Sequence, residues 1–461
     1  MIVAVDVGSG SVRAGLVAEE GIVHVARRTG ALAVTPGRLL GLDLMNLWAR
    51  IADALAEVAV VADERGVAVD ALTCTAIRYA TVWSSPESEK SWSQQSWANL
   101  ARADRIDVDV LQASLTRHDV GRLGGWPTAL SLSSRIASAR RWDLSPPEES
   151  VPLSVSSWIL GRMGAVAHID DVSWADGRVD ARNAPWALPR RSAGAMVGEY
   201  NGVIAGTERW RGARLAVSPP DTVAALHALG GLVPGDAVAI AGTTTPVVAV
   251  AADDDTESSA SIDEASWLPF AEGLRLAESN AARTGESVRA MSLLLDERGD
   301  VAVERIGTVR SFLGQTLVAP RRLGESAPAQ GIEFQESFAQ ADRGDLMRSA
   351  IEANAWATDT QLRRVEHQAG RPGRRFVCGG QTRSAAFLRL LAAAGGRPVE
   401  VVSAEVTLLR AAAAAAGARG AEPSVVVVEP DIDVAQEPQL WARRWWERYE
   451  PAAPRRDGCY E

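Results

Sequence analysis

The chain repeats one layout: a short apolar strand, a turn of glycine and hydroxyl residues, and a second apolar strand. The first copy spans residues 2–17, with the turn Gly-Ser-Gly-Ser at 8–11. The second copy spans residues 236–251, with the turn Gly-Thr-Thr-Thr at 242–245. Glycines let backbone N–H groups approach a ligand closely and hydroxyls add donors, so such turns suit phosphate. The repeat therefore predicts two similar halves, each opening on a hairpin whose turn can donate to phosphate.

Two other interpretations of the first copy stay open at this point. Gly8-x-Gly10 after a strand is also part of the dinucleotide-binding fingerprint, which needs a long helix directly after the glycines. Here strand-like residues follow and stop at Glu19-Glu20-Gly21, which favours a hairpin. The second alternative is an ordinary N-terminal hairpin that binds nothing. For the phosphate-binding interpretation, we expect Asp6 to help hold the metal ion of a nucleotide.

The hydrophobic pattern around these copies predicts an α/β layer architecture. A three-stranded meander at the N-terminus is followed by a helix at 43–64, whose apolar residues recur at helical spacing, and by a strand at 72–77. We expect residues 84–125 to be polar and irregular, 127–163 to be helical with a break at Ser145-Pro146-Pro147, and 170–186 to be a polar excursion. In the second half the pattern predicts helices at 280–295, 342–368, 381–394, 405–416 and 437–449, with strands at 376–378 and 399–402.

Length and charge limit the class of protein. A chain of 461 residues forms two or three domains with ample cores. A net charge of -10 and a pI near 5.3 argue against nucleic acid or an acidic membrane as a partner. Cys74, Cys378 and Cys459 are too far apart in sequence for a disulfide framework or a CxxC metal site. No basic region precedes a long apolar core at the N-terminus, and we expect a cytoplasmic protein with no membrane partner.

Lysine is almost absent, and this excludes two common nucleotide-binding motifs. Lys90 is the single lysine of the chain. A P-loop needs Gly-Lys-Ser/Thr, which does not occur in the sequence, and the protein-kinase pattern needs a strand lysine. A nucleotide must therefore be bound in another way.

Four separated segments together resemble a known family. DVGSGSVRA at 6–14 resembles its first phosphate motif, in the form seen in ribulose kinases and the bacterial autoinducer kinase. VPGDAVAIAGTTTPVVAV at 233–250 is similar to its second phosphate motif, and FVCGGQTRSAAFLRLLAAAGGRPVEV at 376–401 to its adenosine motif. EVTLLRAAAAAAGA at 405–418 resembles its closing helix. With the four segments in order, the chain resembles an FGGY-type carbohydrate kinase of the actin-like/sugar-kinase ATPase superfamily.

This resemblance implies a fold and an activity. The fold is α/β, with two actin-like (ribonuclease H-like) domains facing a central interdomain cleft. Residues 1–232 would form the sugar-binding kinase domain and residues 233–461 the nucleotide-binding domain. The activity is ATP-dependent phosphorylation of a hydroxyl on a sugar or polyol, with ATP and Mg²⁺ as cofactors and an Asp as general base.

The resemblance also implies which residue is the general base. The family has its catalytic Asp in a Gly-Gly-Gly-Asp-type turn a short helix upstream of the second phosphate motif. The matching segment here is Ser218-Pro219-Pro220-Asp221, so Asp221 is the candidate. A purely structural alternative is that Asp221 only caps the following helix. Prolines in place of glycines remove backbone donors and stiffen the turn, so the approach of substrate differs from that in the family.

Further roles follow from the resemblance and from side-chain chemistry. Asp6 and Asp221 would hold Mg²⁺, with Asp6 acting through water. Arg13 would be a phosphate cation, or equally a solvated surface charge, and Thr382 and Ser384 would cap a helix with or without ligand. The residues assigned to the nucleotide are Gly8, Ser9, Gly10, Ser11, Arg13, Gly242, Thr243, Thr244, Gly379, Gly380 and Thr382.

The sugar-binding region departs from the family pattern. The family commonly has Trp-x-Asp-x-Arg, whereas this chain has Trp97 and Arg102 without the Asp and with the spacing shifted by one. Arg78 matches a substrate-side arginine of the autoinducer-kinase branch, and Ser157-Trp158-Ile159 stands where the family has Asp-Tyr-Leu. Buried polar groups that pair with hydroxyls set specificity, so these changes favour a nonstandard sugar or cyclitol over xylulose or glycerol.

Two alternative functions remain at this stage. A degenerate homologue would bind nucleotide or sugar as a sensor without turnover, which the altered turn and sugar element motivate. Another actin-like ATPase, such as an assembly or chaperone protein, is the other alternative. The Asp221 helix directly before the second phosphate motif argues against it. The sequence leaves open whether the chain forms a homodimer.

Overall fold

A computed structural model gives the fold of the chain. It describes residues 1–8, 11–19, 21–29, 42–78, 80–88, 91–92, 97–99, 105–114, 132–141, 150–176, 188–242, 244–253, 266–281, 284–294, 318–320, 332–334, 343–402 and 425–430. The chain divides into two compact units. The first comprises residues 1–231, 258–272 and 406–423, and the second residues 232–257, 273–405 and 424–461.

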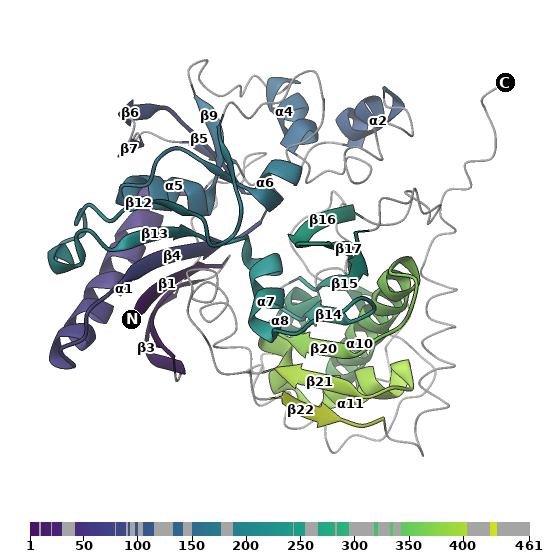
Figure 1. Ribbon diagram of the computed structural model, residues 1–461. Coiled ribbons are helices and arrows are strands. Elements are labelled where there is room, and N and C mark those ends of the chain that lie inside the picture. The colour runs from purple at the N-terminus through teal and green to yellow at the C-terminus, as the bar shows by residue number, and fades with distance from the viewer. Residues whose placement is uncertain are drawn as a thin grey trace. The chain divides into compact units, whose positions relative to one another are not determined.

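The first unit is built on a six-stranded sheet in the order β12-β13-β4-β1-β2-β3 (Figure 1). The central strand β1 pairs antiparallel with β2 and parallel with β4, and β4 pairs parallel with β13. The strands are β1 (Ile2–Val7), β2 (Ser11–Ala18), β3 (Gly21–Thr29), β4 (Ala71–Ala76), β12 (Met196–Glu199) and β13 (Arg214–Val217).

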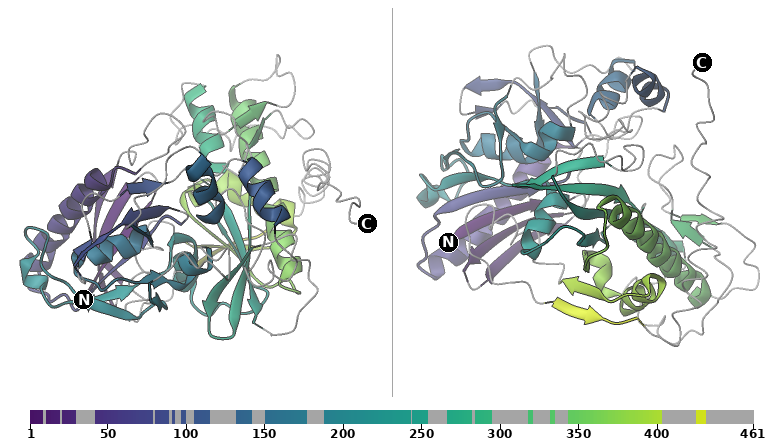
Figure 2. Two further views of the ribbon diagram at one scale, coloured as in Figure 1. Left: turned by 90° about the horizontal axis from the view of Figure 1, so that it is seen from above. Right: turned by 45° about the vertical axis from the view of Figure 1, so that its right-hand side comes forward.

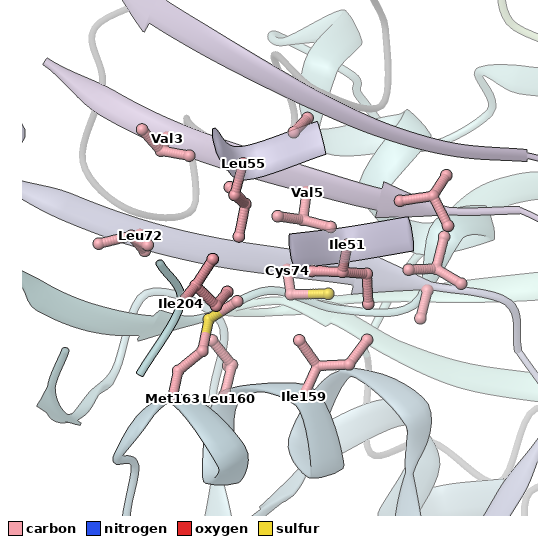
Figure 3. Close-up of a cluster of buried hydrophobic side chains, with 14 of the residues drawn as sticks. Val3, Val5, Ile51, Leu55, Leu72, Cys74, Ile159, Leu160, Met163 and Ile204 are labelled. Atoms are coloured by element: carbon pink, nitrogen blue, oxygen red, sulfur yellow. The ribbon is translucent and has the colours of Figure 1, made fainter. Parts of the chain in front are cut away.

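The core of the first unit lies between this sheet and the helices α1 (Leu44–Glu64) and α5 (Val155–Met163). Figure 3 shows side chains of β1, β4, α1 and α5 meeting in this core. Helix α1 begins at Leu44 because the carboxylate of Asp43 accepts a hydrogen bond from the Asn46 N–H. Its buried face repeats at helical spacing through Leu47, Ile51 and Leu55, as the sequence predicts.

Smaller elements surround this sheet. A three-stranded sheet has the order β8-β5-β9, and two two-stranded sheets are formed by β6 with β7 and by β10 with β11. These elements are β5 (Thr81–Ser84), β6 (Pro86–Ser88), β7 (Ser91–Trp92), β8 (Trp97–Asn99), β9 (Val151–Ser154), β10 (Ile169–Asp170), β11 (Arg190–Arg191), α2 (Arg105–Ala113), α4 (Leu132–Arg141), α6 (Asp171–Asp176), η1 (Glu208–Trp210) and α7 (Asp221–Leu229).

The sheet of the second unit has the order β17-β15-β14-β20-β21-β22. The strand β16 (Ser266–Ala271) lies in the segment 258–272 of the first unit. The long helix α10 (Arg343–Gln368) packs against β14, β15 and β17, as the views of Figure 2 show. The other elements of this unit are β14 (Ala237–Ile240), β15 (Pro246–Ala252), β17 (Leu274–Asn280), α8 (Thr284–Leu294), β18 (Val318–Pro320), β19 (Ile332–Phe334), β20 (Arg375–Cys378), η3 (Gly380–Arg383), α11 (Ala385–Gly395), β21 (Val399–Val402) and β22 (Val425–Val428).

The two sheets repeat one strand topology. In the first unit β2 is antiparallel to β1, and β4 and β13 follow in parallel. In the second unit β15 is antiparallel to β14, and β20 and β21 follow in parallel. A further antiparallel strand lies beyond each parallel set, β12 in the first sheet and β22 in the second. The predicted repeat of strand, glycine turn and strand is thus part of a repeated sheet.

Several predicted elements differ from the observed ones. The region 84–125, expected to be irregular, contains the strands β6, β7 and β8 and the helix α2. The strand β9 interrupts the region 127–163 that was expected to be helical, and α6 lies within the expected polar excursion. These elements are short, and one of them, β9, pairs with a strand that is distant in sequence. Its partner β5 lies some seventy positions away. The helices expected at 405–416 and 437–449 lie outside the described residues.

No helix in the described part of the chain is both long and apolar enough to span a bilayer.

Candidate active site

The candidate site of the first unit lies where three parallel strands end. Strands β1, β4 and β13 are neighbours and run in the same direction, so their carboxyl ends meet at one edge of the sheet. Asp6 is the next-to-last residue of β1, Arg78 follows the end of β4 and Asp221 follows the end of β13. The sheet topology thus brings together Asp6, Arg78 and Asp221, which are far apart in sequence.

Asp6 is the centre of a row of polar side chains across the sheet. It pairs in register with Arg13 on β2 and with Thr75 on β4. Asp6 is only 3% exposed, and its Oδ2 lies 3.6 Å from Nη1 of Arg13. Oδ1 is buried and has no hydrogen-bond partner among the residues that the structure describes. Arg13 is therefore a charge partner of Asp6. Its side chain is 21% exposed, so it is not a fully solvated surface charge.

The pKa of Asp6 is raised to about 7. Burial is the largest cause, the positive charge of Arg13 acts in the opposite direction, and the negative charge of Asp221 raises the pKa further. A buried carboxylate with an unpartnered oxygen and a second carboxylate nearby is an arrangement that a cation stabilises.

Asp221 is the first residue of α7, and the residue before it, Pro220, offers no side-chain cap. Its Oδ1 accepts hydrogen bonds from the N–H of Thr222 at 2.7 Å and from the N–H of Arg78 at 3.4 Å. Burial raises the pKa of Asp221, and the backbone N–H of Thr222 is the largest opposing influence. The carboxylate therefore does bind the start of its own helix, but it also binds the chain that follows β4.

A hydrogen bond from strand β4 holds the proline turn before Asp221 in place. The hydroxyl of Thr75, which is fully buried, donates a hydrogen bond to the carbonyl of Pro219 at 2.8 Å. Proline has a fixed φ and no N–H, so this turn is stiff and donates nothing at positions 219 and 220. Thr75 is also the register partner of Asp6. Strand β4 therefore lies beside the carboxylate of Asp6 and holds the turn that precedes Asp221.

These two carboxylates suit Mg²⁺. The described residues contain no cluster of three or more His, Cys, Asp or Glu side chains that could hold a metal ion. Mg²⁺ does not require such a cluster, because it keeps several waters and is bound through one or two carboxylates together with substrate phosphates. The unpartnered Oδ1 of Asp6 and the partly buried carboxylate of Asp221 meet that requirement.

The first glycine turn has space for a side-chain Cβ at Gly8. The N–H of Gly8 donates to the carbonyl of Ser11 at 3.0 Å, and Ser11 begins β2. A Cβ at Gly8 would meet its nearest atom, the Ser11 carbonyl oxygen, at an ordinary contact distance of 3.6 Å. The described part of the fold therefore does not require glycine at this position. Ser9 and Gly10 lie outside the described residues.

The second glycine turn is similar. The N–H of Gly242 donates to the carbonyls of Ile240 and Thr244, at 2.9 and 3.1 Å. A Cβ at Gly242 would lie 3.4 Å from the Thr244 carbonyl oxygen, which is still van der Waals contact. Thr243 lies outside the described residues.

The two glycines after β20 have different roles. Gly379 has φ 104°, and a Cβ there would lie 2.6 Å from the carbonyl oxygen of Ala241. Gly379 is thus required by close packing against the end of β14. A Cβ at Gly380 would meet nothing within 4 Å among the described residues. The hydroxyl of Thr382 donates to the carbonyl of Gly379 at 2.8 Å, whereas Ser384 is the N-cap of α11 and accepts from the N–H of Phe387.

Gln381 is a site residue that the sequence analysis missed. Its side-chain nitrogen donates to the carbonyl of Gly242 at 3.1 Å and to the hydroxyl of Thr284 at 2.7 Å. Its backbone N–H donates to the carbonyl of Ala241 at 2.9 Å. Gln381 lies between the assigned residues Gly380 and Thr382, but only the three-dimensional structure shows which turn it contacts.

The structure describes little of the predicted sugar-binding residues. Arg78 is partly buried, and its backbone contacts Asp221. The backbone of Trp97 is in β8, paired with Trp83 of β5, and Arg102 lies outside the described residues. Trp158 is fully buried and makes an edge-to-face contact with Trp48, at 6.2 Å between ring centroids. Trp158 is therefore a core residue.

Comparisons with known proteins find a similar family for one segment of the chain. Residues 274–419 match the profile described as the C-terminal domain of the FGGY family of carbohydrate kinases. This segment is similar to the C-terminal domain of that family, and it includes Gly379, Gly380, Gln381 and Thr382. A comparison with curated proteins finds no significant match.

Solved structures show that the whole chain has the fold of such kinases. A xylulose kinase from Rhodospirillum rubrum is 18% identical with a TM-score of 0.76, covering 97% of this chain and 98% of that one. A gluconate kinase from Lactobacillus acidophilus is 13% identical with a TM-score of 0.75, covering 97% of both chains. A glycerol kinase from Plasmodium falciparum, solved with ADP, is 13% identical with a TM-score of 0.73, covering 98% of both chains. The predicted two-domain α/β fold is therefore confirmed.

Proposed function

We propose that the chain catalyses ATP-dependent phosphorylation of a hydroxyl group on a sugar or sugar-like polyol. The observation that carries this proposal is the carboxylate of Asp221. It is held by two backbone N–H groups, its pKa is raised, and its sheet edge also carries the buried Asp6. The FGGY domain in residues 274–419 supports the same reaction class.

Asp221 is the general base of the proposed reaction. All the hydrogen bonds that it accepts from described residues reach Oδ1, so Oδ2 is available to the acceptor hydroxyl. Oδ2 takes the hydroxyl proton as the oxygen attacks the γ-phosphorus of ATP. The new O–P bond forms while the bond between the γ-phosphorus and the bridging oxygen breaks, and ADP leaves. The raised pKa makes Asp221 a stronger base than an exposed carboxylate.

Asp6 and Asp221 are the proposed carboxylates for Mg²⁺, whose charge would offset that of the phosphates when it is bound. The guanidinium of Arg13 interacts with the carboxylate of Asp6, with 3.6 Å between Nη1 and Oδ2. Gly8, Ser9, Gly10 and Ser11 would donate to phosphate oxygens in the first unit. Their backbone and hydroxyl groups suit that role, and the fold does not account for glycine at position 8.

The second unit is proposed to bind the nucleotide, and the first the sugar. Gly242, Thr243 and Thr244 would contact phosphates, and the open position at Gly380 would admit the adenosine. The hydroxyl of Thr382 is already used within its own turn, so its role in binding is secondary. Close packing against Ala241 is enough to explain glycine at position 379, so no ligand contact is assigned to Gly379.

The acceptor is proposed to be a nonstandard sugar or a cyclitol. The solved structures of similar fold include a xylulose, a glycerol and a gluconate kinase, so the fold is compatible with acceptors of varied size and charge. Arg78, Trp97 and Arg102 are the proposed substrate contacts. The resemblance of residues 6–14 to ribulose and autoinducer kinases is the reason to include the acceptors of those two kinases in the panel.

The test is ADP release from MgATP with a panel of sugars, polyols and cyclitols. Asp221→Asn removes the base and keeps the shape, and Asp43→Asn is the matched control, because Asp43 is exposed and asparagine is an equally good N-cap. We expect Asp221→Asn to lower kcat by about 10²- to 10⁴-fold and Asp43→Asn to leave it unchanged. Turnover that survives Asp221→Asn would remove Asp221 from the mechanism.

One observation favours a second function, a homologue that binds ligand without turnover. Pro219 and Pro220 stand where the family has glycines, and they donate no hydrogen bond to a bound substrate. This alternative predicts that a nucleotide or sugar raises the melting temperature while no member of the panel releases ADP.

A further inference from the structure

Gln381 holds two consecutive carbonyl groups of the second glycine turn. Its backbone N–H donates to the carbonyl of Ala241 at 2.9 Å, and its side-chain amide donates to the carbonyl of Gly242 at 3.1 Å. Because the residue belongs to η3, directly after β20, it links the turn that follows β14 to the turn that follows the neighbouring parallel strand.

A buried polar network holds the amide of Gln381 in place. The amide nitrogen donates to the hydroxyl of Thr284, which is itself hydrogen-bonded to the hydroxyl of Thr245. The side-chain nitrogen of Asn354 on α10 donates to the carbonyl of Thr284 at 2.7 Å, and the hydroxyl of Ser287 donates to Oδ1 of Asn354 at 2.9 Å. All four of these partner residues are fully buried. Such a network fixes one arrangement, because each lost hydrogen bond leaves a buried polar group unpaired.

This arrangement matters for an anionic ligand. A phosphate oxygen is attracted by N–H and hydroxyl donors and repelled by the negative end of a carbonyl dipole. A turn that binds phosphate must therefore direct its carbonyls elsewhere. At positions 241 and 242 both carbonyls accept hydrogen bonds from Gln381, so neither is directed at a ligand on the other side of the turn.

We propose that Gln381 is a positioning residue that holds the carbonyls of Ala241 and Gly242 away from the nucleotide phosphates. The inference rests on the proposed binding of nucleotide by the second unit. Gln381 acts through the turn and is not a catalytic residue. Its backbone bond to Ala241 survives any substitution other than proline, so the side-chain amide is the part that mutation can test.

The experiment uses Gln381→Met, which keeps the length of the side chain and removes its donors. Gln361→Met is the matched control, because Gln361 is another hydrogen-bonded amide of the second unit, largely buried and bound to the hydroxyl of Ser279. A second pair, Thr284→Val and Thr284→Ser, removes or keeps the hydroxyl that the amide contacts. Three readouts are compared on the full-length chain: amide exchange of peptides covering 237–249 without ligand, the Kd of a non-hydrolysable ATP analogue, and steady-state kinetics.

We expect Gln381→Met and Thr284→Val to speed exchange across the turn and to raise the Kd of the analogue and the KM for ATP roughly tenfold, while the KM for the acceptor is unchanged. Thr284→Ser and Gln361→Met should resemble the wild type. Unchanged exchange and unchanged analogue affinity in Gln381→Met would overturn the inference. If the wild type bound no nucleotide, the proposed function would fail, and the exchange data would still decide whether Gln381 holds the turn.

Discussion

The buried carboxylate of Asp6 makes the first unit's stability depend on pH, and Asp6→Asn tests this. Asp6 is 3% exposed, and the pKa of its carboxyl group is raised from 3.8 to about 7, mainly by burial. Since the pKa in the folded protein exceeds that in the unfolded chain, folding takes up a proton between these values. The contribution of Asp6 to stability is fully present below pH 3.8 and is lost as pH rises to about 7.

The size of this loss follows from the shift. One pKa unit corresponds to about 1.4 kcal/mol, so ionised Asp6 reduces the free energy of unfolding by about 4 kcal/mol above pH 7. Asparagine has nearly the same shape and does not ionise. We therefore expect Asp6→Asn to gain stability relative to the wild type by about 1.4 kcal/mol per pH unit between pH 5 and 7, with a plateau above that range.

The assay is the free energy of opening measured by amide exchange in peptides from β1 and β4, in EDTA at pH 5, 6, 7 and 8. These peptides report on the first unit by itself, whatever the second unit does. Asp43→Asn, at an exposed N-cap, is the control and should show no such pH-dependent gain. A difference between Asp6→Asn and the wild type that is the same at every pH would refute the reasoning, because it would mean that Asp6 does not change ionisation in this range. At pH 8, Mg²⁺ with ADP should restore stability to the wild type and not to Asp6→Asn.

Three further predictions concern the rest of the chain. For Asp221, whose pKa burial raises, kcat/KM should fall as pH drops through a value above 3.8, because the base must be ionised; a rate profile flat down to pH 4 would contradict this. Gly379→Ala should lower the melting temperature by several degrees because its Cβ meets Ala241, whereas Gly380→Ala should keep the melting temperature and raise the KM for ATP. Arg375 is 2% exposed and pairs with the buried Asp359 and Glu366, so Arg375→Met should cost about 3–5 kcal/mol in urea denaturation, and a neutral result would show that the two carboxylates find other partners.

The sequence predicted the parts of the fold whose signal is local. The hairpins around 8–11 and 242–245, the helix after Asp43 and the helix ending at Gln368 all have a periodic pattern or a capping residue of their own. The strand β13 was missed, because four residues between Arg214 and Val217 become a strand only through pairing with β4, far away in sequence. Without β13 the sequence offers no physical reason for Asp221 to lie beside Asp6, and that proximity was implied only by resemblance.

The roles of the site residues were also only partly predictable from the sequence, and the glycines show the reason. A sequence motif records that glycine occurs and cannot record what occupies the space beside it. At Gly379 that space is filled by the backbone of Ala241, so glycine is explained by the fold alone. At Gly8, Gly242 and Gly380 an added Cβ would meet ordinary contacts or open space in the described structure, and φ is not in the left-handed region. Glycine at these positions raises the conformational-entropy cost of folding, and the packing of the described residues does not require it. All three belong to turns whose chemistry suits phosphate or nucleotide, and the proposed reason for glycine at these positions is the close approach of a ligand.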